Sequence, residues 1–532
     1  MIVTKSNKVF KILFVLAVAA FSCTSAPAAT YTVTNTDDSG PGSLREAIEN
    51  ANDNSGQDVI AFNIPGIGPH AIQPLTPLPP IADPVVIDGY TQPGAAPATY
   101  TTQATLLVEL DGSNVDSGSG LSIGLNISAG NSTIRGLVIN RLAYAGIMIG
   151  GGSGNVIEGN YIGTDVTGTI AQGNSDGIRI EDASSNLIGG TSPAARNIIS
   201  GNTRTGMEIL WSGSVGNTVQ GNYIGTDATG TAGLGNRYQG IHTYADTYTV
   251  IGPGNVVSDN GDSASGIGAG IELSASNQDG YSQVIGNLVG TDVSGTMALG
   301  NFCGIRIMGQ NWNDVKDNIV SNSEITGIWL GDGMSLKAHN NTITGNTVRL
   351  SGGFGIQIEF SNNNLICNNS FIDNQPGLPA VDHGGTGNIF NLDKPLGGNF
   401  WSDWTGPDND HDGFVDSPYL IWTPDNPNGN YSNQDNLPWA SQGGWQNGCL
   451  IQQLQAEVKK LKLHKGLEES ICKKMEEAAK KLDDKKPKEA ANLLEASIKE
   501  VEAQKDKKIE KDAADELIKH TKEVIEVIEK KK

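Results

Sequence analysis

Cysteine, aromatic residues and long apolar runs are all scarce in this chain of 532 residues. Five cysteines are present, and those after the first form no natural pairs. Cys303 and Cys367 fall in different repeats, while Cys449 and Cys472 fall at mismatched heights of a helical segment. We therefore expect a fold that needs no disulfide. The apolar run at 12–21 is too short to cross a bilayer comfortably and no later run is longer, so no membrane span is expected.

The short apolar run instead predicts an export signal. It follows a lysine-rich start and precedes small residues, so residues 1–28 are predicted to be a secretory signal cleaved near Ala28. Cys23 raises the alternative of lipidation, but the preceding residues match a lipoprotein signal poorly. We expect a secreted protein, with the cell surface or the periplasm as its alternative locations.

Positive charge is scarce outside the last 83 residues. Residues 450–532 hold 21 Lys and 19 acidic residues, a net charge of +2, whereas residues 1–449 hold 15 basic and 39 acidic residues, a net charge of −24. An acidic body argues against nucleic acid and anionic membranes as partners. It also disfavours a polyanionic glycan unless metal ions bridge the charges.

A short Gly-Ile phrase recurs every 23 to 34 residues. The apolar residues alternate with others over three or four positions, which is typical of a short strand with one buried face. Repetition at this period predicts a solenoid, in which successive coils stack Ile on Ile. The eight copies begin at Gly146, Gly177, Gly206, Gly240, Gly270, Gly304, Gly327 and Gly355.

A second phrase, Asn-x-Ile/Val-x-Gly/Asp-Asn, lies between the copies of the first. Clear copies span 155–160, 217–222, 255–260 and 341–346. Asn tolerates the left-handed backbone of turns, and stacked coils would place Asn above Asn. We expect ladders of side-chain amides bonded along the solenoid axis.

The N-terminal region predicts a cap for the solenoid. Ser43 and Glu46 form a capping-box pattern that starts a helix at 44–51, which would cover the open apolar end. Residues 30–104 are assigned to this cap and the first coils, and residues 105–400 to the main solenoid. Strands are expected at 30–35, 59–63, 85–88, 105–110, 121–127 and 133–139, with a long Pro-rich loop at 65–97.

Three coils carry nearly identical extensions, at 161–174, 223–236 and 288–301. Their spacing indicates duplication of a two-coil unit. Asp165, Asp227 and Asp292 would align along one edge, and we interpret them as turn residues that bond their own loops.

An Asp-rich segment follows, within the closing region 401–445. Asp408, Asp410, Asp412 and Asp416 surround a glycine in the pattern D-x-D-x-D-G-x-x-D. Such carboxylates can wrap a hard cation, as the start of an EF-hand loop does. No glutamate stands at the twelfth position, so the loop is not a complete EF-hand. We predict a Ca²⁺ site here, and the alternative is a solvated acidic turn.

These motifs resemble known families. Residues 105–420 look like the right-handed parallel β-helix, or pectin-lyase-like, superfamily, and the closing segment is similar to NosD-type repeat proteins. Gly42 to Ala47 resembles the Cys-Ser-Leu-Arg-Glu-Ala signature of secreted β-helix proteins, with Gly42 in place of the cysteine. The resemblance implies a mainly β fold. NosD proteins are associated with copper, but this chain lacks the clustered Met, Cys or His that copper requires.

The C-terminal segment 450–532 changes to Lys, Glu, Ala and Leu. Four helices are expected, at 450–463, 467–482, 488–503 and 512–530, which would form a small α-helical bundle. A long coiled coil is the alternative, disfavoured by the breaks near Gly466 and Pro487. The segment resembles the FIMAH domain of secreted bacterial proteins, and we expect it to mediate interaction with another protein.

Alternation within Gly-Ile-x-Ile points the third residue of each phrase outward. Stacking should therefore build an outer column, with Tyr244 and Glu359 alongside it and Trp211 close by if its strand ends there. The column consists of Met148, Arg179, Glu208, His242, Glu272, Arg306, Trp329 and Gln357.

Two functions fit this column. The first is binding of a polysaccharide or a cell-surface component, with Arg179, Trp211, Tyr244, Arg306 and Trp329 as ligand-binding residues. The alternative is a polysaccharide lyase or glycoside hydrolase with Glu208, His242 and Glu272 as catalytic residues. Glu208 and Glu272, two coils apart, would lie roughly 10 Å apart at the backbone, near the separation used by inverting glycosidases. The signature motifs of polygalacturonases and alginate epimerases are missing from this sequence.

Overall fold

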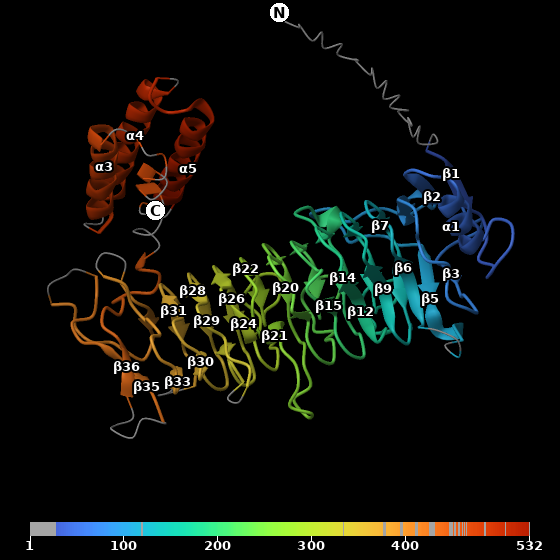
Figure 1. The fold of residues 1–532 in the computed structure, drawn as a ribbon, viewed down its shortest axis with the longest axis horizontal. Coiled ribbons are helices and arrows are strands. Elements are labelled where there is room, and N and C mark those ends of the chain that lie inside the picture. The colour runs from blue at the N-terminus through green and yellow to red at the C-terminus, as the bar shows by residue number, and fades with distance from the viewer. Residues whose placement is uncertain are drawn as a thin grey trace, which may run out of the picture.

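The computed structural model describes residues 28–532 except 117, 119–120, 333–334, 376–378, 394–396, 410–412, 425–430, 446–450, 452–453, 456–457, 460, 462, 464, 484–485, 506 and 531–532. Its body is a tall spiral of short strands in three sheets (Figure 1). Each complete coil adds one strand to sheet A, then one to sheet B, then one to sheet C. The predicted signal peptide and Cys23 fall outside the described residues.

Sheet A consists of β1 (Thr30–Val33), β2 (Asp58–Phe62), β4 (Val85–Asp88), β7 (Thr133–Arg135), β10 (Val156–Glu158), β13 (Leu187–Gly189), β16 (Thr218–Gln220), β19 (Val250–Ile251), β22 (Gln283–Ile285), β25 (Asp314–Lys316), β28 (Thr342–Thr344) and β31 (Leu365–Cys367). Sheet B consists of β3 (His70–Ile72), β5 (Val108–Asp111), β8 (Val138–Asn140), β11 (Tyr161–Ile162), β14 (Ile198–Ile199), β17 (Tyr223–Ile224), β20 (Val256–Val257), β23 (Leu288–Val289), β26 (Ile319–Ser321), β29 (Thr347–Arg349), β32 (Ser370–Ile372) and β34 (Phe400–Trp401).

Sheet C consists of β6 (Ile123–Ile127), β9 (Ala145–Gly150), β12 (Asp176–Glu181), β15 (Met207–Leu210), β18 (Ile241–Tyr244), β21 (Ile271–Asp279), β24 (Ile305–Asn311), β27 (Ile328–Leu330), β30 (Ile356–Glu359), β33 (Ala380–His383), β35 (Tyr419–Trp422) and β36 (Tyr431–Asp435). Within the described residues the paired strands are parallel except β35 and β36, which close sheet C as an antiparallel pair. The prediction of a right-handed parallel β-helix is therefore confirmed.

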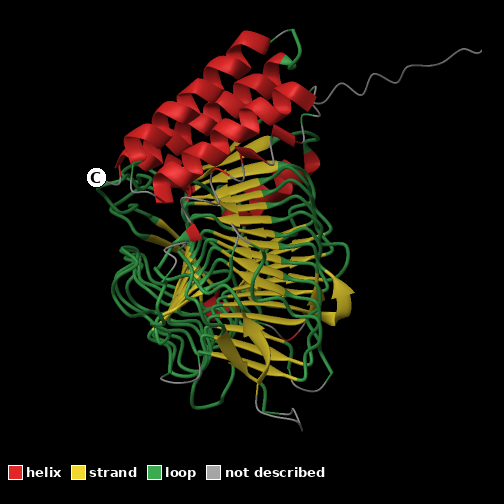
Figure 2. Ribbon diagram, turned by 90° about the vertical axis from the view of Figure 1, so that its left-hand side faces the viewer, coloured by secondary structure: helices red, strands yellow, loops and turns green. Residues whose placement is uncertain are grey.

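The interior of the spiral is filled by stacked aliphatic side chains. In sheet C, Ile147, Ile178 and Met207 lie on successive coils in direct register and are fully buried. Aromatic residues close the C-terminal end of this core, where Trp401 stacks on Phe371 at 4.5 Å and on Tyr419 at 4.3 Å between ring centroids. The parallel rungs are visible in Figure 2.

The N-terminal end is closed by helix α1 (Leu44–Asp53), two residues longer than predicted. Ser43 accepts a hydrogen bond from the backbone of Glu46, as a capping box requires. Glu46 reaches back to the backbone N–H of Gly42 rather than to that of Ser43. Leu44 and Ile48 are buried against the first coils, so the helix covers the apolar end of the solenoid.

One predicted strand was wrong. The segment 133–139 was expected to be a single strand, but it divides into β7 and β8 at Gly136, where φ is +73°. A Cβ atom on this glycine would lie 2.8 Å from the backbone nitrogen of Tyr90. Because the turn of an earlier coil presses against this position, the chain must bend there, and the sequence pattern of one segment does not show that contact.

The predicted asparagine ladders are confirmed at all three corners. At the corner between sheets A and B each side-chain amide donates to the amide oxygen of the next coil, at 2.9–3.2 Å. This A–B ladder runs through Asn160, Asn197, Asn222, Asn255, Asn287, Asn318, Asn346, Asn369 and Asn399. Shorter ladders include Asn155–Asn186–Asn217 and Asn174–Asn202–Asn236.

The A–B ladder ends on a carboxylate instead of an amide. Asp435 accepts hydrogen bonds from the backbone of Asn399 at 2.7 Å and from the indole N–H of Trp401 at 3.0 Å. It is fully buried, and burial raises its pKa to about 6. Asp435 thus satisfies donors that have no further coil above them.

The three extensions are held as predicted. Asp227 accepts the hydroxyl of Thr229 and the backbone N–H groups of Thr231 and Ala232. Asp165 and Asp292 repeat this arrangement in their own loops. These aspartates are therefore turn residues.

The extensions also contact one another across two coils. The backbone N–H of Ala228 donates to Gly168 O at 2.9 Å, and that of Val293 donates to Gly230 O at 2.9 Å. Tyr161 and Tyr223 are buried beneath the extensions on the outer side of sheet B. This face of the solenoid is consequently covered by its own chain.

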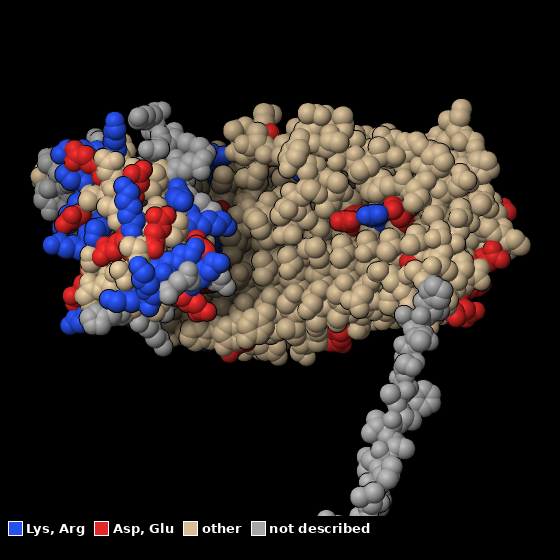
Figure 3. Space-filling view, turned by 90° about the horizontal axis from the view of Figure 1, so that it is seen from above, with Lys and Arg blue, Asp and Glu red and all other residues tan. Residues whose placement is uncertain are grey.

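The C-terminal segment folds into α3 (Lys465–Asp483), α4 (Pro487–Gln504) and α5 (Lys511–Lys530), each within two residues of its prediction. Half of the first predicted helix, at 450–463, lies outside the described residues. A separate apolar core includes Leu454, Val458, Met475 and Leu494. Figure 3 shows dense charges of both signs on this helical module and few charges on the visible face of the β-helix. No helix in the described part is both long and apolar enough to span a membrane.

Candidate functional site

The outer column on sheet C is confirmed by strand register. Arg179 pairs with Glu208, Glu208 with His242, and His242 with Glu272 on successive coils. The column continues through Arg306, Trp329 and Gln357. Because paired strands lie about 4.8 Å apart, each side chain is within reach of the next.

The charges in the column alternate from coil to coil. Arg179 forms ion pairs with Glu208 and with Asp176, the latter at 2.9 Å. His242 lies between the two glutamates, with Nδ1 3.5 Å from Glu208 and Nε2 3.8 Å from Glu272. Arg306 completes the series 3.8 Å from Glu272. The central column is therefore a row of self-paired charges.

These outward-pointing side chains are nevertheless largely buried. Glu208 and Glu272 are only 5% and 6% exposed, and Arg179 is 9% exposed. The reason is lateral packing: Tyr144 lies 5.1 Å under the guanidinium of Arg179, and Gln239 donates to Glu272 at 3.2 Å. The charged groups form a floor, and neighbouring side chains cover their flanks.

Sequence reasoning missed three members of this floor: Asp176, Arg204 and Glu181, which pairs with Arg179 at 2.7 Å. Asp176 is fully buried and binds both Arg179 and Arg204, the latter at 3.2 Å. A signal was present, because Asp176 directly precedes a Gly-Ile phrase where the other copies carry an uncharged residue. Arg204 stands in an irregular turn, and no periodic pattern identifies it.

The protonation states follow from the pairing. Burial favours the neutral form of Glu208, but His242, Arg179 and Arg204 outweigh it and lower the pKa of Glu208, so this carboxylate is ionised. Burial also opposes charge on His242, but Glu208 and Glu272 outweigh it and raise the pKa of His242. The stabilising charge on His242 is fully present below its ordinary pKa of about 6.5 and is lost as the pH rises through the raised value.

Aromatic side chains border the charged floor. Trp211 follows β15 directly, is 47% exposed and meets Tyr244 edge to face at 5.6 Å. Arg306 lies 4.7 Å over the ring of Trp329. The indole nitrogen of Trp329 and Nε of Arg306 are buried without a hydrogen-bond partner. The structure thus brings all predicted ligand-binding residues onto one face of sheet C.

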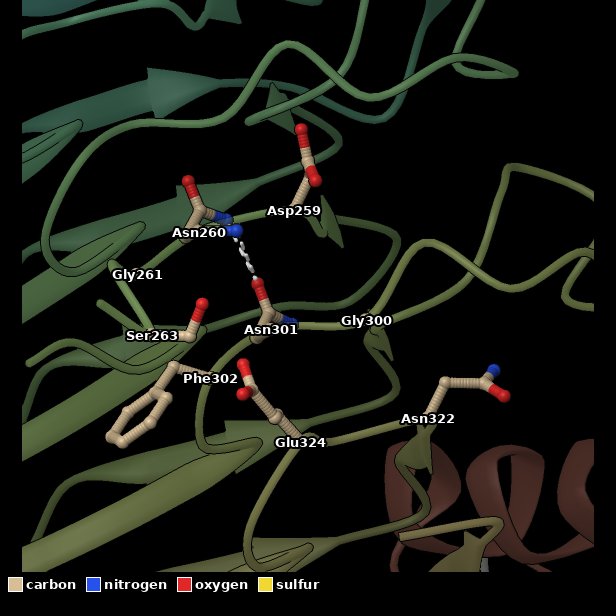
Figure 4. Close-up of a pocket in the computed structure, with 9 residues that line it drawn as sticks. All are labelled: Asp259, Asn260, Gly261, Ser263, Gly300, Asn301, Phe302, Asn322 and Glu324. Carbon is tan, nitrogen blue, oxygen red and sulfur yellow. Dashed lines mark hydrogen bonds between the residues drawn. The ribbon is translucent and has the colours of Figure 1, made fainter. Parts of the chain in front are cut away.

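A pocket of about 370 Å³ lies elsewhere, at the turns between sheets B and C (Figure 4). Ser263, Phe302 and Glu324 lie on one side of it. Beside them, the side-chain amide of Asn260 donates a hydrogen bond to the amide oxygen of Asn301 at 3.1 Å. None of the predicted site residues lines it. Its lining comes from turns of three coils, which a search for strand periodicity does not bring together.

The Asp-rich segment is described only in part. Asp408 accepts a hydrogen bond from the backbone of Gly413 at 3.1 Å, and Asp416 accepts one from the backbone of Asn409 at 3.0 Å. Both carboxylates therefore bind within the same loop. Asp410 and Asp412 lie outside the described residues, so the Ca²⁺ site stays a prediction.

Comparisons with known proteins found similarity to parts of this chain. Residues 293–406 match the family model described as periplasmic copper-binding protein (NosD). A 3-dehydroshikimate dehydratase of Acinetobacter baylyi is 30% identical over 247 residues, which cover 37% of this chain and 48% of that protein. The chain thus spans about half the length of this relative.

Two solved structures are similar at low identity. The Dettilon tailspike protein has a TM-score of 0.45 at 16% identity, covering 73% of this chain and 71% of that one. An α-1,3-glucanase catalytic unit from Streptomyces thermodiastaticus has a TM-score of 0.40 at 16% identity, covering 68% and 69%.

The residues in the NosD-like segment do not fit a copper site. Cys303 is fully buried, donates its thiol to Thr326 O at 3.4 Å, and burial raises its pKa to about 12. The ring nitrogen Nδ1 of His339 accepts a hydrogen bond from Asn362 at 2.9 Å. In the described part of the chain, no three His, Cys, Asp or Glu residues converge on a metal position.

Proposed function

We propose that this protein binds a neutral polysaccharide along the outer face of sheet C. The observation that carries this proposal is the self-paired floor from Arg179 to Arg306, which is bordered by Trp211, Tyr244 and Trp329. Cations and carboxylates in the floor largely neutralise one another, so it offers no surplus charge to a polyanion. Flat aromatic rings beside hydrogen-bonding groups suit sugar rings, which combine apolar faces with hydroxyl edges.

Binding fits the ionisation of the site better than catalysis does. An inverting glycosidase needs a protonated carboxyl group as general acid. Glu208 is instead held ionised by Arg179, Arg204 and His242. Glu272 lies against His242 and Arg306, so it too faces cations.

One observation favours the enzyme alternative, a lyase or glycoside hydrolase. His242 lies between two carboxylates that raise its pKa, and perturbed ionisable groups of this kind gather at catalytic sites. In this alternative the imidazolium, rather than a glutamic acid, donates the proton.

Substitution of the aromatic border tests the binding proposal. We expect Trp211→Asn combined with Tyr244→Ala to weaken retention of neutral polysaccharides by about tenfold or more, because exposed aromatic anchors dominate such interfaces. Binding is measured by affinity electrophoresis on neutral and acidic polysaccharides. Arg135→Gln, which breaks the Asp88–Arg135–Glu158 cluster on sheet A, is the matched control and should bind normally.

Assays for reducing sugars and for unsaturated products decide between the two functions. Turnover by the wild type that is abolished by Glu208→Gln or Glu272→Gln would replace the binding proposal with the enzyme alternative. Retention that is unchanged in the aromatic variant would refute the sheet C site.

We also propose that the Asp-rich segment binds Ca²⁺ and thereby fixes the last coils. Addition of Ca²⁺ to chelator-treated protein is expected to raise the thermal midpoint by a few degrees, because a ligand that binds only the folded state stabilises it. The measurement is differential scanning fluorimetry with Ca²⁺ and with Mg²⁺. The double variant Asp408→Asn, Asp416→Asn should lose the Ca²⁺ response, and a wild type without any response contradicts the proposal.

For the remaining regions we propose that residues 1–28 direct export and that the helical module mediates interaction with another protein. Support for the latter is its own apolar core, which includes Ile471, Leu494 and Leu517 and makes it a unit separate from the solenoid core.

A further inference from the structure

The corner between sheets C and A contains a row of left-handed residues, one in each coil. Their φ values lie between 51° and 74°. At nearly all of these positions the backbone N–H donates a hydrogen bond to a carbonyl oxygen on the next coil, that of the residue just before the equivalent position. The row therefore runs parallel to the solenoid axis. In chain order the positions are Asn131, Gly154, Ser185, Gly216, Tyr248, Tyr281, Trp312, Asn340, Asn363 and Gly387.

Three consecutive positions of this row carry large aromatic side chains. Gly and Asn are the residues that adopt a left-handed backbone most readily, and bulky side chains are disfavoured there. Tyr248, Tyr281 and Trp312 occupy it nonetheless, and they are 56%, 42% and 50% exposed. Since these side chains are neither buried in a core nor favoured by the backbone, folding does not explain them. Strained residues that persist in this way gather at functional sites.

The rings are arranged along the solenoid axis. Tyr248 and Tyr281 are stacked, with centroids 5.4 Å apart and planes inclined by 13°. This separation is close to the spacing of about 4.8 Å between paired strands, so one ring lies over the other from coil to coil. The adjoining positions on the N-terminal side are small: a Cβ atom at Gly216 would meet nothing within 4 Å. Gly216 therefore places no side chain over the outer face of Tyr248.

Polar groups flank the rings. The hydroxyl of Tyr281 donates to Asp279 at 3.3 Å, and Asn311 donates to the other oxygen of Asp279 at 3.4 Å. Among the exposed large apolar residues, Val215 is the aliphatic neighbour on this corner, at 37% exposure. The same coils also depart from the asparagine ladder, because Ser282 and not an asparagine accepts from Thr249.

We propose that Tyr248, Tyr281 and Trp312 form a stacking platform that holds a neutral glycan chain along the axis of the solenoid. Flat rings with hydrogen-bonding edges suit a sugar ring, which combines apolar faces with hydroxyl edges. Repetition at one ring per coil suits a polymer of rings. Asp279 and the acidic body disfavour a polyanion. The platform is separate from the sheet C site, and it rests on the proposed function only for the class of ligand.

The test replaces each ring by the residue that other coils use at the same position. The variant Tyr248→Asn, Tyr281→Asn, Trp312→Asn should fold with an unchanged or higher thermal midpoint, because asparagine relieves the backbone strain. We expect its affinity for neutral polysaccharides to fall by about tenfold or more. Leu350→Asn is the matched control, since Leu350 is also left-handed (φ 54°) and 51% exposed but lies at another corner.

The outcomes separate this platform from the sheet C site. Loss of binding in the triple variant but not in Leu350→Asn supports the platform, whatever the Trp211 and Tyr244 variant does. Normal binding by the triple variant overturns the platform and leaves the sheet C proposal intact. If the wild type binds none of the neutral polysaccharides, the platform is also overturned.

Discussion

Asn222→Ala is expected to lower the free energy of unfolding by about 3 kcal/mol or more, because each buried polar group left without a partner costs about 1–3 kcal/mol. Asn222 is fully buried in the middle of the A–B ladder. Its amide donates to Ile188 O at 2.9 Å, and its oxygen accepts from the amide and the backbone of Asn197 at 2.9 and 3.2 Å. Alanine removes all of these partners at a position that is closed to bulk solvent.

Chemical denaturation followed by circular dichroism measures this effect. Asn114→Ala is the control, because Asn114 is exposed outside the ladders, and such substitutions usually change stability by less than about 0.5 kcal/mol. Equal stability of the two variants would contradict a structural role for the ladder. Because each coil contacts only its neighbours, we expect the loss to be concentrated in the coils around Asn222.

Asp435→Asn is expected to remove a pH-dependent loss of stability. The raised pKa of Asp435, about 6 against the ordinary 3.8, means that the folded protein binds more protons between these values than the unfolded chain does. Stability contributed by this group is therefore lost as the pH rises from about 4 to about 6, by about 2–3 kcal/mol in all. Asparagine keeps an acceptor for Asn399 and Trp401 and does not ionise, but its amide nitrogen cannot accept from the backbone N–H of Leu437 as Asp435 does. The stability of the variant relative to the wild type should therefore rise between pH 4 and pH 7.

The measurement is the difference in unfolding free energy between wild type and Asp435→Asn at pH 4, 5, 6 and 7. Trp401 donates to Asp435 and so provides a local fluorescence probe. Asp393→Asn is the control, because Asp393 is exposed and lies outside the ladders. A difference that does not change with pH would show instead that the burial of Asp435 does not oppose its charge.

The repeated phrases predicted most of the solenoid because each residue acts through its nearest equivalents. Ile178 packs on Ile147, and Asn197 bonds to Asn222, so a period in the sequence becomes a contact in space. The order of residues in the sheet C column follows from the same argument. The turn aspartates, such as Asp227, were predictable because they bond within five residues of themselves.

What could not be predicted depends on contacts between dissimilar segments. The burial of Glu208 arises from Arg179, Arg204 and His242, which are spread over three coils and have no common motif. Asp435 ends the ladder from a segment without periodicity. The aromatic row at the C–A corner was missed because its signal is a backbone angle, and the residues carry that angle in spite of their type.

Because the extensions contact one another, the structural repeating unit of this solenoid is a pair of coils rather than a single coil. Gly168 receives Ala228, and Gly230 receives Val293, always at an interval of two coils. Insertion or deletion of one coil would bring an extension against a bare turn, whereas a change by one whole pair would restore every junction. Variants of this protein that differ in length should therefore differ by about 62 to 65 residues, the spacing between successive extensions.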